Sequence, residues 1–450
     1  MVVQSRPSLP PSVVALGLVS LAMDLSSEII HALLPLFMVG TLGLSVAAVG
    51  LIDGIAESTA SITKVFSGWL SDHLGRRKPL ILLGYGLGAI SKPLFPLATG
   101  ALPVLAARFA DRIGKGIRGA PRDALIADVT PAQIRGRAFG LRQSMDTVGA
   151  FAGPLVAIGL MLLLDNDMRA IFWIAVIPAV VAVLLVLFAV KEPEAAPDAD
   201  NRVPLRLAEL RKLDRAYWAV VAIGVLFTLA RFSEAFLILK ASAEGLPLWL
   251  APAVLVVMNL VYSLAAYPAG IASDRIGTRG MLLASLVLLA AADLLLALAP
   301  GLGAAFAAIA LWGLHMGLSQ GLLSRLVADR ASPPLRGSAF GLFNLATGLA
   351  MLIASVTAGL LWDWAGPGAT FLAGAAFASA AGLCLLTARP VQWSTPQPRC
   401  STSAGSRRCS RRAEAIEPPA PRSRKAGLRG RFALPGPLPA PRAACRIPRR

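Results

Sequence analysis

Charged residues are scarce in this chain of 450 residues: Asp, Glu, Lys and Arg make up 15%, whereas hydrophobic residues make up 56%. A water-soluble protein of this length needs a larger polar surface to cover its core, so the composition argues against one. Cysteine is scarce too. Three of the four cysteines lie near the C-terminus and no two form a CxxC pair, so neither a zinc site nor a disulfide framework is predicted.

Motifs of ATP-driven and metalloprotease chemistry, GxxxxGK[ST] and HExxH, are absent from the sequence. Gly114-x-Gly116-x-x-Gly119 matches the dinucleotide-binding pattern, but it lies inside an apolar stretch with no preceding strand. We therefore expect no enzymatic activity, no cofactor and no metal.

The formal net charge of +18 is concentrated at the C-terminus. Residues 389–450 hold 15 of the 43 Lys and Arg residues and only two acids, Glu414 and Glu417. Rich in Pro, Arg, Ala and Ser, this segment is predicted to be a disordered basic tail. A solvated segment near anionic lipid is favoured over nucleic-acid binding, and a read-through end of a GC-rich gene is a further alternative.

Long apolar stretches recur along residues 1–388. Each has about 20 residues or more, enough for one bilayer crossing as a helix. Twelve crossings are predicted, and an even number places both termini on the same side. They cover 13–39, 44–68, 79–98, 102–126, 137–163, 170–190, 216–240, 248–271, 280–299, 303–327, 338–362 and 367–388.

Basic residues lie on alternate connections between these crossings. One set of connections includes Arg135, Arg211 and Arg336, whereas the opposite connections at 40–43 and 300–302 carry no charge. Because Lys and Arg gather in cytoplasmic loops, both termini are predicted to be cytoplasmic, in a cell (inner) membrane.

Two sequence patterns recur at nearly the same offset. Gly68-Trp-Leu-Ser-Asp72-His-Leu-Gly75 returns 202 residues later as Gly270-Ile-Ala-Ser-Asp274-Arg-Ile-Gly277, and Arg135-Gly-Arg-Ala-Phe-Gly-Leu141 returns 201 residues later from Arg336 to Leu342. This duplication predicts two six-helix halves, 1–190 and 216–388, joined by a charged linker at 191–215 and followed by the tail at 389–450.

Three motifs resemble those of the major facilitator superfamily (MFS). They are Gly68-x-x-x-Asp72-x-x-Gly75-Arg76-Arg77-Lys78 after the second span, Arg108 in the fourth span, and Gly149-x-x-x-Gly153-Pro154 in the fifth span, the last being similar to a motif of proton-driven exporters. The resemblance covers residues 1–388. It implies the MFS fold, an all-α membrane protein of twelve transmembrane helices in two six-helix pseudo-repeats, and a transporter that works as a monomer.

The loop motif predicts a gate. Gly68 lets helices approach closely, and Asp72 is expected to face a helix N-terminus or an arginine. The basic triplet Arg76, Arg77 and Lys78 is expected to pair with acids of the other half in one state. Asp274 and Arg275 repeat the motif in the second half, and membrane orientation alone is the alternative role.

The motif of the fifth span, Gly149, Gly153 and Pro154, predicts a small-residue packing face and a kink. The corresponding residues of the second half are Ala350, Ala354 and Ser355, so the motif is present in the first half only. This one-sided pattern is similar to that of antiporters in the family. Simple tight packing is the alternative.

Ionisable residues inside the first three spans predict a transport path. Asp24 lies about 16 Å into the first span, counting 1.5 Å per residue, and Glu28 and His31 share its helix face. Asp53 and Glu57 repeat this spacing in the second span. Such residues must face a cavity or one another, and a carboxylate shielded from water can carry a proton. We assign Asp24 and Glu28 a proton or substrate role, with permanent ion pairs as the alternative.

The fourth span carries a basic stripe within about 120° of the helix, at 100° per residue. Its residues are Arg108, Arg112, Lys115, Arg118 and Arg122. The stripe cannot face lipid, so we expect it to pair with Asp111, Asp123 and the acids of the first two spans, or else to form an anion path. The remaining candidates for the proton and substrate path are Lys92, Arg112, Arg231, Glu234, His315 and Asn344.

Taken together, the sequence predicts a secondary transporter of a small solute that works by alternating access, most simply as proton-coupled efflux. Organic-anion uptake or exchange is one alternative, suggested by the basic stripe. A non-transporting membrane sensor with the same fold is another. The expected partners are the small-molecule substrate, protons and the lipid bilayer, without nucleic acid.

Overall fold

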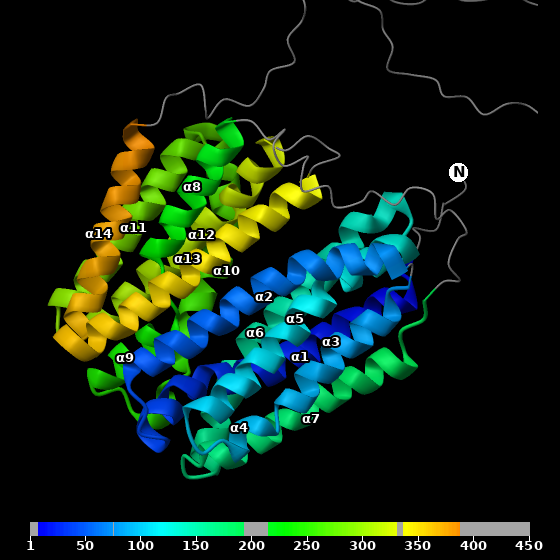
Figure 1. Cartoon of the computed structure of the whole chain (residues 1–450), viewed down its shortest axis with the longest axis horizontal. Coiled ribbons are helices and arrows are strands. Elements are labelled where there is room, and N and C mark those ends of the chain that lie inside the picture. Colours follow the sequence, from blue (N-terminus) through cyan, green and yellow to red (C-terminus); the bar gives the residue numbers. More distant parts are fainter. Residues whose placement is uncertain (1–7, 75, 193–214, 331–335, 388–450) are drawn as a thin grey trace, which may run out of the picture. The chain divides into compact units, whose positions relative to one another are not determined.

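The computed structural model describes residues 8–74, 76–192, 215–330 and 336–387, which form helices and short connections without a β-strand (Figure 1). We call 8–192 the N-terminal half and 215–387 the C-terminal half. Most of the predicted linker (193–214) and the predicted tail (389–450) lie outside the described residues.

Long apolar sequences form the helices of the N-terminal half. These are α1 (Pro11–Leu36) with the π-turn η1 (Phe37–Thr41), α2 (Val46–Leu74), α3 (Lys78–Ser91), α4 (Leu94–Leu97), α5 (Ala101–Val129), η2 (Ala132–Ile134), α6 (Arg135–Leu163) and α7 (Met168–Phe188).

The C-terminal half repeats this order. Its helices are α8 (Arg215–Ala230), α9 (Ala235–Ala243), η5 (Leu248–Leu250), α10 (Ala253–Ile276), α11 (Thr278–Leu298), α12 (Leu302–Arg330), α13 (Arg336–Ala365) and α14 (Pro367–Thr387).

Successive crossings run in opposite directions. We call the end where α1 begins and α14 ends the basic end, because Lys78, Arg135 and Arg279 lie there, and the opposite end the far end. Within the described ranges, eleven helical segments are long and apolar enough to cross a membrane. The predicted crossing missing from these eleven is the fourth, which corresponds to α5. The 29 residues of α5 span about 43 Å, but the basic stripe lowers the mean hydropathy of this helix. The predicted all-helical fold is confirmed.

Two predicted spans are interrupted. The prediction of one continuous helix over 216–240 is wrong, because the chain is non-helical at 231–234, between α8 and α9. At this break the Ser233 hydroxyl accepts a hydrogen bond from Ala235 N–H at 3.2 Å and so caps α9. The span 79–98 is also interrupted, after Ser91, where Pro93 cannot donate a helical hydrogen bond.

Small residues bring α2 and α13 of the two halves together. A Cβ added to Gly50 would lie 2.2 Å from the Ser355 carbonyl oxygen, and one added to Gly359 would lie 2.7 Å from Ala47 Cα. Side chains larger than hydrogen do not fit at these positions, so the helices touch backbone to backbone. Figure 1 shows α2 and α13 running side by side.

Candidate functional site

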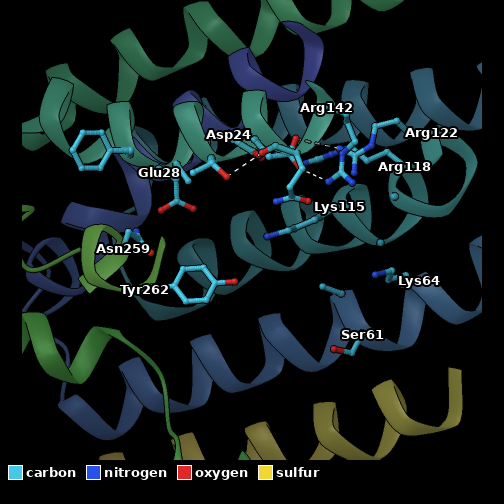
Figure 2. Close-up of a pocket in the computed structure, with 18 of the residues that line it drawn as sticks. Asp24, Glu28, Ser61, Lys64, Lys115, Arg118, Arg122, Arg142, Asn259 and Tyr262 are labelled. Atoms are coloured by element: carbon cyan, nitrogen blue, oxygen red, sulfur yellow. Dashed lines mark hydrogen bonds and ion pairs between the residues drawn. The ribbon is translucent and has the colours of Figure 1, made fainter. Parts of the chain in front are cut away.

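A cavity of 470 Å³ lies between the two halves (Figure 2). We call it the large cavity. Helices α1, α2, α5 and α6 form one wall, and α10 and α13 form the other. Its polar lining residues are Asp24, Glu28, Ser61, Lys64, Lys115, Arg118, Arg122, Arg142, Gln143, Asp146, Thr147, Asn259, Tyr262, Ser263 and Asn344.

The predicted carboxylates and the predicted packing motif contact each other. A Cβ on Gly149 of α6 would lie 3.1 Å from Asp24 Cβ, and one on Gly153 would lie 2.5 Å from Glu28 Cβ. The glycines therefore let α6 press against the carboxylate face of α1, with Pro154 buried next to Gly153. Glu28 lies 3.4 Å from His31 Nδ1, as expected for residues sharing a face. The motif thus fixes where the carboxylates stand in the cavity wall.

The basic side of the large cavity contains an ion-pair network that joins α5 and α6. Arg122 lies 3.1 Å from Asp123 and 3.9 Å from Asp146, and Arg142 lies 3.5 Å from Asp123 and also pairs with Asp146. Arg142 and Asp146 were not among the predicted site residues. The sequence did carry a signal for them, because Arg142 and Asp146 are four residues apart in the fifth predicted span and so lie on the same helix face. Arg118 places its guanidinium 4.8 Å from the Tyr85 ring centroid.

Two cations of this cavity stand outside the close ion pairs of the described residues. Lys64 and Lys115 are exposed, and within the described ranges neither forms a hydrogen bond or an ion pair within 4 Å. The two lysines lie at the same height along the helices, because their chain neighbours Thr63 and Gly116 are in contact where α2 packs on α5. A Cβ on Gly116 would lie 2.5 Å from Thr63 Cβ. Of the dinucleotide-like pattern, Gly114 and Gly116 therefore serve helix packing, whereas a Cβ on Gly119 would meet nothing within 4 Å.

A second cavity of 230 Å³, the small cavity, adjoins the first and shares Glu28, Lys115 and Asn259 with it. The basic stripe meets its predicted partners here. Arg108 Nη2 lies 2.8 Å from Asp53 Oδ1, and Arg112 Nη1 lies 3.3 Å from Glu57 Oε1. The other charged residues of its lining are His31, Arg231 and Glu234.

Asp53 also connects the two halves. Its second oxygen, Oδ2, accepts a hydrogen bond of 2.8 Å from Ser233 Oγ in the break between α8 and α9. Arg231 and Glu234 flank Ser233 and face the small cavity. The residues between α8 and α9 that interrupt the seventh predicted span therefore line the small cavity, and one of them binds Asp53 of the N-terminal half.

Some predicted path residues lie elsewhere. Lys92 and Asp111 form a buried ion pair of 2.8 Å with each other and line neither of these two cavities. His315 is 1% exposed, bonds through Nδ1 to the Ser285 carbonyl at 2.8 Å and lines neither cavity. Nearby, Gly317-Leu-Ser319-Gln-Gly321 has the spacing of a hydrolase nucleophile motif, but Ser319 is buried and donates to the His315 carbonyl oxygen.

The basic residues of the loop motif bind within their own half. Arg77 contacts Ser71 at 2.7 Å and Asp128 at 3.4 Å, both in the N-terminal half, and its pairing with acids of the other half stays a prediction. Lys78 donates to the carbonyl oxygens of Leu187 and Val190 at the end of α7. Arg76 is exposed, Gly75 lies outside the described residues, and so do the side-chain surroundings of Gly68, Asp72, Asp274 and Arg275.

Arg279 makes the corresponding contact in the second half, although the offset of 202 residues aligns it with Arg77. It donates to the Leu385 carbonyl oxygen at 3.1 Å and to that of Leu386 at 2.5 Å, at the end of α14. Each half therefore ties its third crossing to the C-terminus of its last crossing with a cation, which also suits the helix dipole.

At the far end, Asp363 of α13 binds the N-terminus of α2. Its Oδ1 and Oδ2 accept hydrogen bonds from Val46 N–H at 3.1 Å and Ala47 N–H at 2.9 Å. The sequence did not indicate this contact, because the partner of Asp363 is helix-terminal backbone more than 300 residues away. Across the described ranges no group of three or more His, Cys, Asp or Glu side chains is placed to hold a metal ion.

Membrane-length helices in two halves around polar cavities define a multi-pass membrane protein of the transporter type. The sequence model of the Major Facilitator Superfamily matches residues 16–260 and 249–432, so the chain belongs to this family.

Known proteins agree with this assignment. An uncharacterized MFS-type transporter of Methanocaldococcus jannaschii is 31% identical over 384 residues, which are 84% of this chain and 95% of that protein. The class C tetracycline resistance protein of Escherichia coli is 31% identical over 66% of this chain and 78% of its own length. The fold is also that of a POT family transporter crystallised with 5-aminolevulinic acid, with a TM-score of 0.72 at 14% identity, covering 86% of this chain and 97% of that one.

Proposed function

We propose that this transporter couples the movement of a small organic solute to protons, and that Asp24 and Glu28 carry the protons. The observation that supports this assignment is the position of both carboxylates in the wall of the large cavity, against Gly149 and Gly153. Asp24 has no hydrogen-bond or ion-pair partner within the described ranges, so its charge is not held in a permanent bridge. A carboxylate of this kind in a membrane-spanning segment is suited to proton exchange.

Alternating access accounts for the contacts between the halves. Ser233 with Asp53, and Asp363 with the α2 N-terminus, join the halves by a few hydrogen bonds that must break when the halves rock apart at the far end. The site then opens to one side at a time. We place the basic end in the cytoplasm, with both termini there, in a cell (inner) membrane. A single chain contains the whole cavity, so a monomer suffices.

Efflux is the direction we propose, with protons moving inward. The packing of the exporter-like Gly149 and Gly153 motif on the proton-carrying residues supports it. So does the relative named for tetracycline resistance, since removal of a compound from the cell is one way to confer resistance.

Organic-anion transport is a second candidate, favoured by a specific observation. Five cations line the large cavity against three carboxylates, and Lys64 and Lys115 are unpaired within the described ranges. An anionic group bound between these lysines would satisfy both. It would bind better when Asp24 and Glu28 are protonated, so solute and proton would then move in the same direction.

Flux in proteoliposomes under an imposed pH gradient tests both candidates. Efflux by exchange predicts that solute leaves the compartment that protons enter, and the anion candidate predicts movement in the same direction. The variants Asp24→Asn and Glu28→Gln should abolish the gradient dependence. Asp165→Asn is a matched control, because Asp165 lies in a far-end turn with φ of 48°, which asparagine also adopts.

Gradient-driven flux that persists in the Asp24→Asn and Glu28→Gln double variant would refute the proton assignment. Ligand binding without flux, in protein with intact helical structure, would instead identify the sensor alternative.

A further inference from the structure

Asp293 is a buried carboxylate that neither cavity contains. It lies on α11, five residues before the end of that membrane-length helix, and its exposed fraction is 0%. Neither of its carboxylate oxygens has a hydrogen-bond partner in the part of the chain that the structure describes. Buried carboxylates are almost always paired, so this one requires an explanation.

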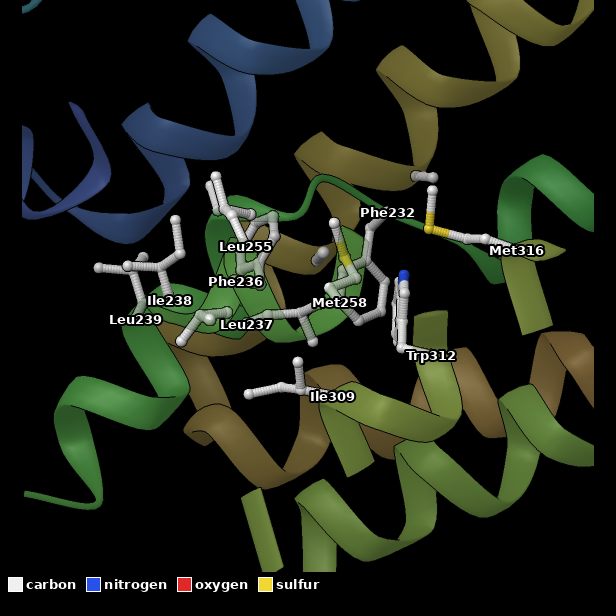
Figure 3. Close-up of a cluster of buried hydrophobic side chains, with 14 of the residues drawn as sticks. Phe232, Phe236, Leu237, Ile238, Leu239, Leu255, Met258, Ile309, Trp312 and Met316 are labelled. Atoms are coloured by element: carbon white, nitrogen blue, oxygen red, sulfur yellow. The ribbon is translucent and has the colours of Figure 1, made fainter. Parts of the chain in front are cut away.

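The neighbours of Asp293 are a glycine and aromatic rings. A Cβ added to Gly374 of α14 would lie 2.5 Å from Asp293 Oδ2 and 3.0 Å from Phe232 Cε1, so the carboxylate occupies the space that the glycine leaves beside Phe232. Phe232 in turn packs on Trp312 and Phe371, with ring centroids 5.4 Å and 5.5 Å away. Figure 3 shows Phe232 and Trp312 side by side in this cluster.

No charge compensates Asp293 within the described ranges. The break contributes Arg231 and Glu234, α12 contributes His315, and α14 has no charged residue from Pro367 to Thr387; none of these groups pairs with or hydrogen bonds to Asp293. Tyr262 of α10 lines the large cavity and bonds to Gln320 of α12. Burying an unpaired ionised carboxylate in such surroundings is strongly unfavourable, whereas a protonated carboxyl group is tolerated.

A further cavity lies next to this group. A cavity of 20 Å³, room for one water molecule, is lined by Phe232, Gly374 and Thr370. Gly374 and Phe232 are also the residues that border the space occupied by the Asp293 carboxylate. Trp312 Nε1 is a buried donor that also lacks a partner, so this region has hydrogen-bonding capacity that the protein itself does not use.

We propose that Asp293 is a second proton-binding site, located in the C-terminal half, that controls the break between α8 and α9. Phe232 transmits the effect, since it borders the same space beside Gly374 as Asp293 and its neighbour Ser233 bonds to Asp53. With the proton bound, the neutral side chain allows Phe232 to remain packed and the Ser233–Asp53 bond to stay closed. When the proton leaves to water, the carboxylate must gain a polar partner, and the break rearranges. The proposal extends the proton coupling proposed above to the other half.

Infrared spectroscopy of the purified protein tests the binding site without transport. Wild-type protein at neutral pH should show the carbonyl band of a protonated carboxylic acid, identified by its shift in heavy water. Asp293→Asn should remove that band, whereas Asp165→Asn should keep it. Circular dichroism and the melting temperature establish that the variant is folded. A band that survives Asp293→Asn, or a wild-type spectrum without it, would overturn the assignment.

Coupling is tested separately in proteoliposomes. If Asp293 takes part in transport, Asp293→Asn should move fewer protons per solute than wild type while still binding the solute. Loss of the infrared band with unchanged stoichiometry would overturn the role in coupling. Failure of the function proposed above looks different: wild-type flux would then be insensitive to the pH gradient, although the Asp293 band would remain.

Discussion

Asp53 and Ser233 are 180 positions apart in the chain, yet the Ser233 hydroxyl donates a 2.8 Å hydrogen bond to the Asp53 carboxylate. The same carboxylate binds Arg108 at 2.8 Å through its other oxygen. A charge-bearing residue of the N-terminal half thereby holds the non-helical break of the C-terminal half. The bond is positioned to report, and to limit, movement between the halves.

Replacing Ser233 by alanine should weaken this connection. A hydrogen bond to a charged group contributes about 1.5–3 kcal/mol, so Ser233→Ala should shift the population toward states with separated halves. Distances between spin labels on the two halves measure the shift. Ser379→Ala is the matched control, because Ser379 bonds only to the Ala375 carbonyl of its own helix. Equal distance distributions in Ser233→Ala and wild type would contradict this role.

Gly153→Ala should reduce both stability and transport. The added Cβ would lie 2.5 Å from Glu28 Cβ, so α1 and α6 must separate or Glu28 must move, at a cost of about 1–3 kcal/mol. Melting temperature and solute flux measure the two effects. Gly159→Ala on the same helix meets nothing within 4 Å and should be neutral or stabilising. Similar behaviour of the two variants would show that the contact with Glu28 is not critical.

Lys64→Gln and Lys115→Gln test the charge of the solute. If an anionic group binds between them, each variant should weaken its affinity at least about tenfold, or about 1.4 kcal/mol. Thermal stabilisation by a carboxylate and by the amide of the same skeleton gives the comparison. Lys191→Gln removes an exposed lysine outside both cavities and serves as control. A preference for the carboxylate that remains in the double variant would exclude these lysines as the anion site.

Asp363→Asn should favour opening at the far end. The substitution keeps the shape of the side chain but removes the charge that Val46 and Ala47 N–H groups bind, which contributes about 0.3–1 kcal/mol at a helix N-terminus. Labelling of cysteines introduced along the far-end part of α2 should become faster than in wild type. Unchanged labelling rates, or equal acceleration in Asp165→Asn, would argue against a latch at Asp363.

Glu244, outside the membrane-spanning segments, should give stability a pH dependence. Hydrogen bonds from the Lys240 side chain and, secondarily, from Gly301 N–H at 2.6 Å lower the pKa of Glu244 below its usual 4.5. A group with a lowered folded-state pKa stabilises the fold above its unfolded pKa, and this contribution is lost as pH falls through the folded pKa. The melting temperature of wild type should therefore decrease as the pH is lowered from 4.5. Glu244→Gln should lack this part of the decrease; an identical pH profile would exclude Glu244 as its source.

Much of the fold could be predicted because hydrophobic length and repetition are local properties. The apolar stretches predicted most crossings within a few residues, and the duplicated Gly68 and Arg135 patterns predicted two similar halves. The break at 231–234 could not be predicted this way. It contains no glycine or proline, and polar contacts with the other half, above all with Asp53, stabilise it.

The candidate site was predictable in residue type more than in arrangement. Helix periodicity put Asp24 and Glu28 on one face, and the scarcity of charge made Arg108 and Asp53 notable. Periodicity could not show that Gly149 and Gly153 press on those carboxylates, that Lys92 and Asp111 pair with each other, or that His315 bonds to Ser285. Each of these facts depends on which helices are neighbours.

The sequence by itself determined that little charge is available and that most of the surplus lies beyond residue 388. It also determined that the charges inside the membrane must find partners or a cavity, because lipid cannot solvate them. Only the tertiary structure decided which charges find partners. Arg108, Arg112 and Lys92 are neutralised by acids on neighbouring helices. Lys64 and Lys115 instead face the large cavity, and the buried Asp293 has no hydrogen-bond partner among the described residues. Pairing depends on distances between helices, which the order of residues along one helix does not contain.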